Sequence, residues 1–107
     1  MEVILAGPDP EPVGDAIEAA GGTVTVLEGV PAAASLKAAG VEHADVLVLT
    51  DASLATAVPV ALEVNAELRT VIYDERTAPA FVQGQLDLSV DPRLVDSEAL
   101  ATALLEA

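Results

Sequence analysis

Short apolar runs alternate along the chain with Ala-rich stretches whose apolar residues recur at helical spacing. Strands of a parallel sheet are buried on both faces, so they are typically continuous runs of Val, Ile and Leu. Runs of this kind separated by helical stretches are typical of βαβ units. Five such runs predict strands at residues 3–6, 23–27, 45–50, 70–73 and 86–90, the last of them weaker and at a sheet edge.

Proline and glycine mark the helices that the pattern predicts between these strands. Pro12 and Pro31 suit the first turn of a helix, where a missing N–H is not needed, and Gly21, Gly22 and Gly40 suit helix ends. The predicted helices are at about residues 12–20, 31–39, 53–66, 78–83 and 99–106, with Asp51 or Ser53 capping the third and Asp96 or Ser97 the last. Pro59 lies inside the third and predicts a kink there, or a break into two pieces.

The fold prediction is one Rossmann-like α/β domain over residues 1–107, with about five parallel strands and helices on both faces in three layers. We prefer strand order 3-2-1-4-5 over the flavodoxin-like order 2-1-3-4-5. Ligands of such sheets bind where the strand order reverses. The preferred order puts Asp9, Asp74 and Arg76 at that crevice, whereas the alternative puts Asp51 there.

The net charge of −14 bears on the salt concentration in which the protein is expected to work. Eighteen carboxylates face four Lys and Arg, so the surface repels itself at ordinary ionic strength, and molar salt screens that repulsion. This composition resembles that of proteins from salt-accumulating halophiles; an acidic mesophilic protein is the alternative. Nucleic acid is not expected as a partner, because binding it needs a basic stripe.

The sequence lacks the residues that several classes of chemistry require. There is no Cys, which excludes disulfides, thiolate metal sites and Cys nucleophiles. Neither a lysine-bearing P-loop nor a serine nucleophile elbow is present. No apolar run is long enough to span a bilayer, and the first residues lack the basic segment of a signal peptide, so we expect a cytoplasmic protein without membrane insertion.

A family resemblance rests on two stretches of the chain. They are residues 43–51, which read HADVLVLTD, and residues 69–73, which read RTVIY after an intervening helix. Together with the segment LSVDPRL at residues 88–94, they resemble the N-terminal nucleotide-binding half of TrkA-type (RCK) potassium-uptake regulators. The resemblance implies a Rossmann sheet that holds NAD or an adenine nucleotide across the first βα turn.

The turn in question departs from the G-x-G-x-x-G pattern of that family. Gly7 and Gly14 match its first and third glycines only with two residues inserted, and Asp9 replaces the middle one. A diphosphate is held by free backbone N–H groups, and Pro8, Pro10 and Pro12 remove three of them. Asp9 and Glu11 add negative charge at the same place. Glu28 matches the acidic residue that would hold a ribose, about twenty residues past Gly7.

Polar residues follow the predicted strands at their carboxyl ends, where open α/β sheets bind ligands. One reading is a pocket whose arginines grip a small anionic ligand. Another is a Mg²⁺ or Mn²⁺ ion that is bound by two or more of the acids Asp9, Asp51 and Asp74. The structural alternative is that these are ordinary polar loops in an acidic chain. The residues proposed to bind a cofactor are Gly7, Asp9, Gly14, Glu28, Thr50, Asp51, Asp74 and Arg76; Glu75, Asp91 and Arg93 share the same rim.

Asp9 and Asp51 also resemble the acid pair of phosphoacceptor receiver domains. Those domains place Ser or Thr after the fourth strand and Lys after the fifth, where this chain has Asp74 and Arg93. A working phosphoacceptor is therefore not expected. His43 has no second ligand or nucleophile nearby in sequence and is interpreted as a surface or capping residue.

The leading hypothesis from these residues is a non-enzymatic module. It would be a stand-alone relative of the TrkA-type domain with a degenerate glycine loop, acting as a nucleotide-sensing or protein-interaction subunit, as a homodimer or with a regulated partner protein. The alternative is a small enzyme, Mg²⁺-dependent, with its site on the acidic rim.

Overall fold

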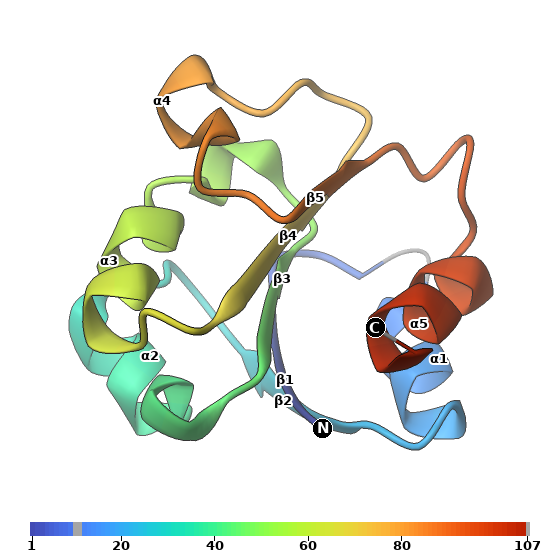
Figure 1. Cartoon of the computed structure of the whole chain (residues 1–107), viewed down its shortest axis with the longest axis horizontal. Helices are drawn as coiled ribbons and strands as arrows, with labels where there is room; N and C mark the ends of the chain where they lie inside the picture. Colours follow the sequence, from blue (N-terminus) through green and yellow to red (C-terminus); the bar gives the residue numbers. More distant parts are fainter. Residues whose placement is uncertain (10–11, 107) are drawn as a thin grey trace.

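The computed structural model of the chain describes residues 1–9 and 12–106. Its centre is a five-stranded sheet in which every pairing is parallel. Helices cover both faces of the sheet, and a further short helix, α4 (Ala80–Gln83), lies at the end of the molecule where the strands finish (Figure 1). The strands are β1 (Glu2–Ala6), β2 (Thr23–Leu27), β3 (Val46–Leu49), β4 (Arg69–Tyr73) and β5 (Leu88–Val90). The predicted α/β class with parallel strands and helices on both faces is confirmed.

The strand order is β2-β1-β3-β4-β5, so the preferred order 3-2-1-4-5 was wrong and the flavodoxin-like alternative is correct. β1 pairs with β2 and β3, and β4 pairs with β3 instead of β1. The alternation of apolar runs along the sequence is the same for both orders, so that pattern does not distinguish them. The order reverses between β1 and β3, so the loops after these two strands meet.

The helices are α1 (Val13–Ala19), α2 (Ala33–Ala38), α3 (Ala57–Val64), α4 (Ala80–Gln83) and α5 (Ser97–Glu106). Two short 3-10 helices, η1 (Val41–His43) and η2 (Ala52–Leu54), precede β3 and α3. The single long helix predicted at residues 53–66 is divided into two pieces, η2 and α3, but the division falls at residues 55–56 and not at Pro59. Pro59 lies in the first turn of α3, where its lack of an N–H leaves no helical bond unmade.

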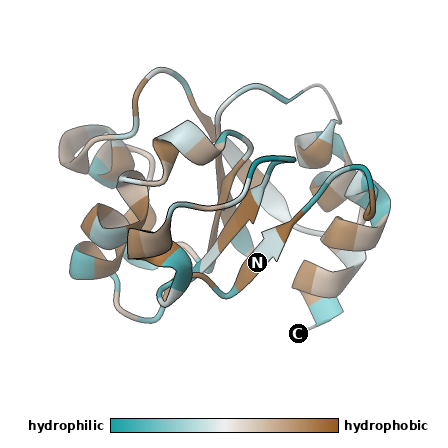
Figure 2. Cartoon of the chain, turned by 90° about the horizontal axis from the view of Figure 1, so that it is seen from above, coloured by the Kyte–Doolittle hydropathy of each residue, from teal (hydrophilic) through white to brown (hydrophobic). Residues whose placement is uncertain are grey.

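The apolar core has two halves, one on each face of the sheet. One half lies under α2, α3 and η2 and includes Ile4, Leu47 and Ile72. The other lies under α1 and α5 and includes Leu5 and Val48, whose side chains alternate with the first set along the same strands. Figure 2 shows apolar residues concentrated on the central strands and on the helix faces turned toward them. No helix within residues 1–9 and 12–106 is long and apolar enough to cross a membrane.

Candidate functional site

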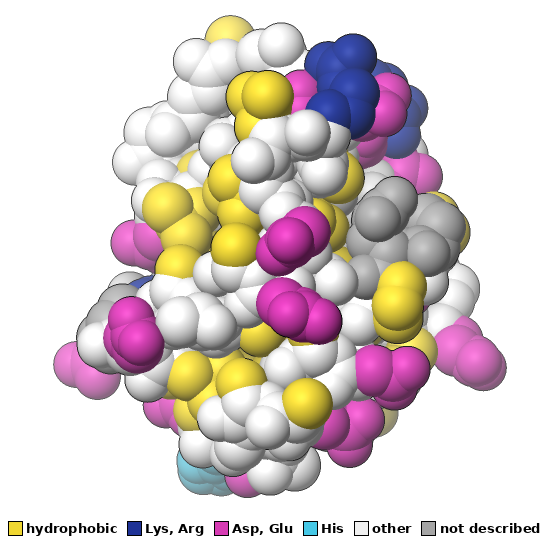
Figure 3. Space-filling model, turned by 90° about the vertical axis from the view of Figure 1, so that its right-hand side faces the viewer, with side chains coloured by type: hydrophobic (Ala, Val, Ile, Leu, Met, Phe, Trp, Pro, Cys, Tyr) yellow, Lys and Arg dark blue, Asp and Glu magenta, His cyan; other side chains and the backbone are white. Residues whose placement is uncertain are grey.

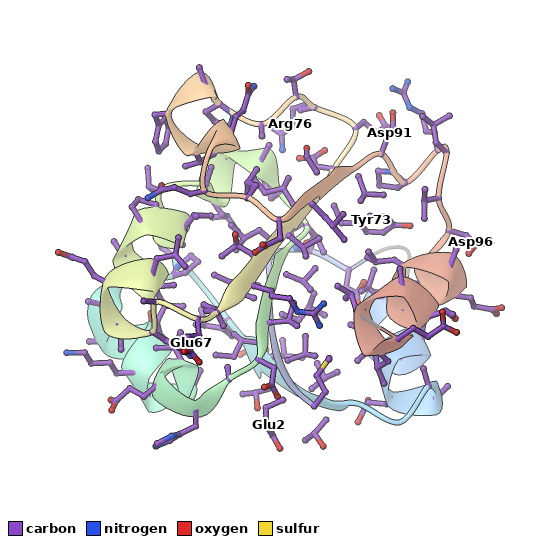
Figure 4. The ribbon with its side chains drawn as sticks, viewed as in Figure 1. Glu2, Glu67, Tyr73, Arg76, Asp91 and Asp96 are labelled. Atoms are coloured by element: carbon purple, nitrogen blue, oxygen red, sulfur yellow. The ribbon has the colours of Figure 1, made fainter. Side chains whose placement is uncertain are left out.

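The predicted rim lies at the carboxyl ends of the strands. Arg76 follows β4 and Asp91 follows β5, and both lie at the same end of the molecule, whereas Glu2 and Glu67 lie at the opposite end (Figure 4). The loops after β1 and β3 reach this end as well, because all strands run parallel. The structure therefore brings together most of the residues predicted from strand ends.

Asp9 stabilises the beginning of α1. Its Oδ1 accepts a hydrogen bond from the Val13 N–H at 2.7 Å, and its Oδ2 accepts one from the Gly14 N–H at 3.1 Å. These free amides at the start of a helix are the groups that hold a phosphate in nucleotide-binding turns. The carboxylate of Asp9 takes that place itself. Glu11, the second acid predicted in this turn, lies outside the described residues.

Gly7 permits the sharp turn after β1. Its φ of +104° is one that residues with a side chain rarely adopt, and a Cβ there would lie 2.5 Å from Thr50 Oγ1. The Thr50 hydroxyl donates to the Pro8 carbonyl and also lies 3.4 Å from the Ala6 carbonyl. Gly7 and Thr50 thus join the loops after β1 and β3 by close packing and hydrogen bonds. Gly14 lies in α1 against β1, where an added Cβ would be in ordinary contact with Leu5.

Arg76 links the loops after β3 and β4. Its guanidinium donates to Asp74 Oδ2 from Nη2 at 2.9 Å and from Nε at 3.1 Å, and its Nη2 also donates to Asp51 Oδ1. Asp51 accepts from the backbone N–H and hydroxyl of Ser53 as well. Asp74 accepts the Ala52 N–H at 2.6 Å. We name these three side chains, Asp51, Asp74 and Arg76, the arginine clamp.

The arginine clamp keeps its carboxylates ionised. Hydrogen bonds from the Ser53 hydroxyl and N–H, and then the Arg76 guanidinium, lower the pKa of Asp51 against a smaller opposing effect of burial. Burial raises the pKa of Asp74, but bonds from the Ala52 N–H and from Arg76 together outweigh it and lower the pKa. The same contacts, with Asp74 first, raise the pKa of Arg76. Asp51, Asp74 and Arg76 therefore all have partners within the chain, and the bonds to Asp51 are all accepted by its Oδ1.

A second arginine forms a similar local pair after β5. Arg93 Nη2 donates to Asp91 Oδ2 at 2.8 Å, and Arg93 Nε lies 3.8 Å from Glu75 Oε1. Hydrogen bonds from Arg93 lower the pKa of Asp91, and Asp91 raises that of Arg93. Both arginines of the rim are thus paired with carboxylates of this chain, Arg76 with Asp74 and Asp51 from two loops and Arg93 chiefly with Asp91 of its own loop.

A small cavity of about 190 Å³ lies where the loops after β1, β3, β4 and β5 meet. It is lined by Asp9, Val13, Thr50, Tyr73, Asp74, Glu75 and Pro92. Its volume is below the roughly 300–1,000 Å³ of pockets for drug-sized ligands. Tyr73, whose hydroxyl donates to the Val95 carbonyl at 2.5 Å, forms its apolar wall and was not among the predicted site residues. Its sequence signal was its place as the last residue of a buried strand.

Two residues of the predicted site, Glu28 and Asp51, do not line this cavity, although Asp51 belongs to the arginine clamp. Glu28 is exposed after β2, at the sheet edge, and is not among the residues that line the cavity. Asp51 is turned toward Arg76 and Ser53 and does not line the cavity either. Within the described residues, no group of three or more His, Cys, Asp or Glu side chains could hold a metal ion. A Mg²⁺ site made of all three acids, Asp9, Asp51 and Asp74, is thus not assembled.

The solved structures that resemble this fold are described as other kinds of protein than the predicted family. An orphan response regulator of H. pylori has a TM-score of 0.74 at 16% sequence identity, with 99% of this chain and 94% of that chain covered. A protein described as pilus assembly-related from Burkholderia pseudomallei has a TM-score of 0.70 at 15% identity, covering 99% and 87%. A protein described as the pilus assembly protein CpaE from Burkholderia thailandensis has a TM-score of 0.67 at 16% identity, covering 99% and 96%.

The resemblance to TrkA-type regulators is therefore wrong, because the similar folds are of the receiver type, with the strand order found here. The apolar third strand followed by Asp, which suggested it, is common to both folds. No curated protein matches the sequence. The profile of a family of unknown function, DUF7126, matches residues 3–104, and the chain belongs to that family.

Proposed function

We propose that this protein is a non-catalytic module that binds a protein partner through a receiver-like fold. The observation that carries the proposal is the state of the acidic rim: Asp9 is taken up by the amides of α1, and Asp51 and Asp74 by Arg76. A phosphoryl acceptor or a metal ligand needs a carboxylate free to react or to coordinate. Here both oxygens of Asp9, both oxygens of Asp74 and the Oδ1 of Asp51 accept bonds from other parts of the chain.

A protein partner is favoured by the apolar surface near β5. Phe81, the only Phe of the chain, lies on α4 and is 59% exposed, and Leu88 on β5 is also exposed. A groove of about 360 Å³ runs between these elements and is lined partly by Ala78, Leu86 and Leu88. Aromatic residues are enriched where proteins contact partners. The similar structures are named as a response regulator and as pilus-assembly proteins, and these names are consistent with a function that involves binding to other proteins.

A ligand panel tests the first half of the proposal. We expect that NAD, AMP and ATP leave the melting temperature unchanged in high salt, whereas a ligand at a hundred times its Kd would add about 2.7 kcal/mol of stability. Acetyl phosphate with Mg²⁺ should give no phosphorylated protein by intact mass. A nucleotide-dependent shift would support a sensing module instead, and a phosphoryl adduct that is lost in Asp51→Asn would support a working receiver.

Site-specific crosslinking tests the second half. A photoreactive residue at position 81 should give one discrete adduct with a different protein in the native cell, because Phe81 is an exposed aromatic residue of α4, one of the two elements that border the α4–β5 groove. The same residue at the exposed Glu63 of α3, on another helix, serves as the matched control and should give none. Equal, diffuse labelling from both positions would count against a partner at the α4–β5 groove.

A further inference from the structure

The sheet has two open edges, and they differ in charge and length. β2 has five residues, Thr23-Val24-Thr25-Val26-Leu27, none of them charged, and the four residues before it carry no charge either. β5 has three residues, with Asp87 directly before it and Asp91 directly after it. Natural proteins protect edge strands by making them short or charged. β5 has both protections, whereas β2 is longer and has a charged neighbour, Glu28, only at its carboxyl end.

The outer side of β2 offers unpaired backbone groups. The Thr23 N–H donates to the Met1 carbonyl at 2.8 Å, so Thr23 faces β1. Backbone groups alternate between the two sides of a strand, so the N–H and C=O groups of Val24 and Val26 face outward. Within the described part of the chain neither residue makes a hydrogen bond to another loop or side chain on that side. The Val26 side chain is 61% exposed.

We propose that β2 pairs with β2 of a second copy of this chain, antiparallel about a two-fold axis at Thr25, which joins the two sheets into one. A two-fold contact brings the same surface from both copies together. In this register Val24 of one copy lies opposite Val26 of the other, as a hydrogen-bonded pair, and Thr25 lies opposite Thr25. Glu28 then lies opposite Gly22, so no two carboxylates face each other. Pairs of β-branched residues stabilise such contacts.

The same operation on β5 is unfavourable. A two-fold axis at Ser89 puts Asp87 of one copy opposite Asp91 of the other on both sides of the axis. Like charges directly opposite each other destabilise a strand pair. Charge therefore selects the β2 edge, on a molecule whose net charge of −14 opposes most other contacts between copies. Salt above about 1 M, where the Debye length is about 3 Å, strengthens the dimer because it screens that overall repulsion.

Sedimentation equilibrium of the full chain in about 1–2 M KCl tests the proposal. We expect a monomer–dimer equilibrium that Val26→Pro weakens at least tenfold, about 1.4 kcal/mol. Proline removes an N–H that faces away from β1, so the strand keeps its bonds within the fold. Thr25→Glu, an exposed position, should also abolish the dimer because two carboxylates would then meet on the axis. Far-UV circular dichroism checks that both variants are folded.

Ser89→Pro is the matched control on the other edge. The Asp74 N–H donates to the Val90 carbonyl at 3.1 Å, so Val90 faces β4 and the backbone of Ser89 faces outward, like that of Val26. This variant should dimerise like the wild type. A wild type that stays monomeric up to about 1 mM, or a dimer that tolerates Val26→Pro and Thr25→Glu, would overturn the proposal. Sedimentation uses the purified chain without any partner protein. Neither a monomer nor a dimer in that experiment therefore changes what the crosslinking test at position 81 measures.

Discussion

Carboxylates beyond β1, β3 and β4 stabilise the loops in which they lie. Asp9 accepts two amides of α1, Asp51 accepts those of its own turn at Ser53, and Asp74 accepts the Ala52 N–H from the neighbouring loop. A short acidic side chain reaches nearby amides with little loss of entropy, and it satisfies groups that a helix or turn leaves unpaired. An acid at a strand end can therefore have a structural role, as an acceptor for nearby backbone amides, in the absence of any ligand.

Gly7 is required by both its backbone and its surroundings. Gly7→Ala should destabilise the protein by at least about 1 kcal/mol, because its φ is +104° and the new Cβ would meet Thr50 Oγ1 at 2.5 Å. Gly84→Ala is the control, since Gly84 has a φ of −74° and no atom within 4 Å of a new Cβ. It should be neutral or stabilising by up to about 1 kcal/mol. Urea denaturation measures both, and equal effects would contradict the assignment.

The arginine clamp predicts a defined pH dependence. Asp51 and Asp74 have lowered pKa values in the folded state, against 3.8 in the reference state. Their contribution to stability is therefore complete above that value and is lost as the pH falls through the folded pKa. Arg76→Gln should be less stable than the wild type by a constant amount above about pH 5, and the difference should shrink below pH 3.8.

Lys37→Gln is the control for that titration. Lys37 is exposed on α2 and makes no ion pair with the described residues, so its removal changes the net charge by the same amount. The stability difference between this variant and the wild type should not follow the same acid-side curve. Denaturant midpoints at a series of pH values give both curves, and superimposable curves would mean that the clamp contributes nothing specific.

At the scale of elements, α1 and α5 form one packed layer on their face of the sheet. Ile17 of α1 and Leu100 and Leu104 of α5 are all fully buried in the same half of the core. Asp96 begins α5 by accepting the Ala99 N–H at 2.8 Å, which confirms one of the two predicted caps. Arg69 Nη2 donates to the Leu104 carbonyl at 2.8 Å and joins the end of α5 to β4. The last helix is thus fixed at both ends.

Leu100→Ala should destabilise the protein by about 2–5 kcal/mol, since it removes a fully buried side chain and leaves a cavity between α5 and the sheet. Leu94→Ala is a control of identical chemistry, because Leu94 is 83% exposed in the loop before α5. Its effect should stay within about 0.5 kcal/mol. Chemical denaturation measures both free energies. A large loss in Leu94→Ala would mean that the loop packs against another surface in solution.

At the scale of the whole molecule, charge dominates the surface. Acidic side chains are spread over the face that carries α1 and α5, and basic side chains are confined to small areas of it (Figure 3). Since four cations face eighteen carboxylates, most acids have no cation to pair with. Such a surface opposes the compact state through its own repulsion, and ions in solution reduce that opposition.

Salt should therefore stabilise the monomer itself. We expect the urea midpoint to rise between about 0.1 M and 1 M KCl, over which the Debye length falls from about 10 Å to 3 Å. Because dimerisation would also raise the midpoint, the comparison is made with Thr25→Glu at low protein concentration. Sucrose at equal osmolality controls for exclusion from the surface. A midpoint that does not change with KCl would refute the expectation drawn from composition.

Sequence reasoning identified nearly every element of the fold but not the neighbours of each strand. The five strands were predicted within two residues at each end, because burial on both faces leaves continuous apolar runs such as residues 46–49. The candidate site residues were chosen because they follow those runs. What each one contacts was not predictable, since the Asp74 side chain binds an amide 22 positions earlier and Arg76 a carboxylate 25 positions earlier.

The amino-acid sequence by itself determined the α/β class, the parallel strands, the acidic surface and the lack of cysteine chemistry, because these follow from local periodicity and composition. Only the tertiary structure decided that β1 lies between β2 and β3, and hence that Thr50 meets the turn at Gly7. The physical reason is that pairing order depends on contacts between segments distant in sequence. Because of such contacts, Asp9, Asp51 and Asp74 bond to other groups of the chain. The positions of carboxylates in the sequence do not reveal whether they bond within the chain or to a ligand.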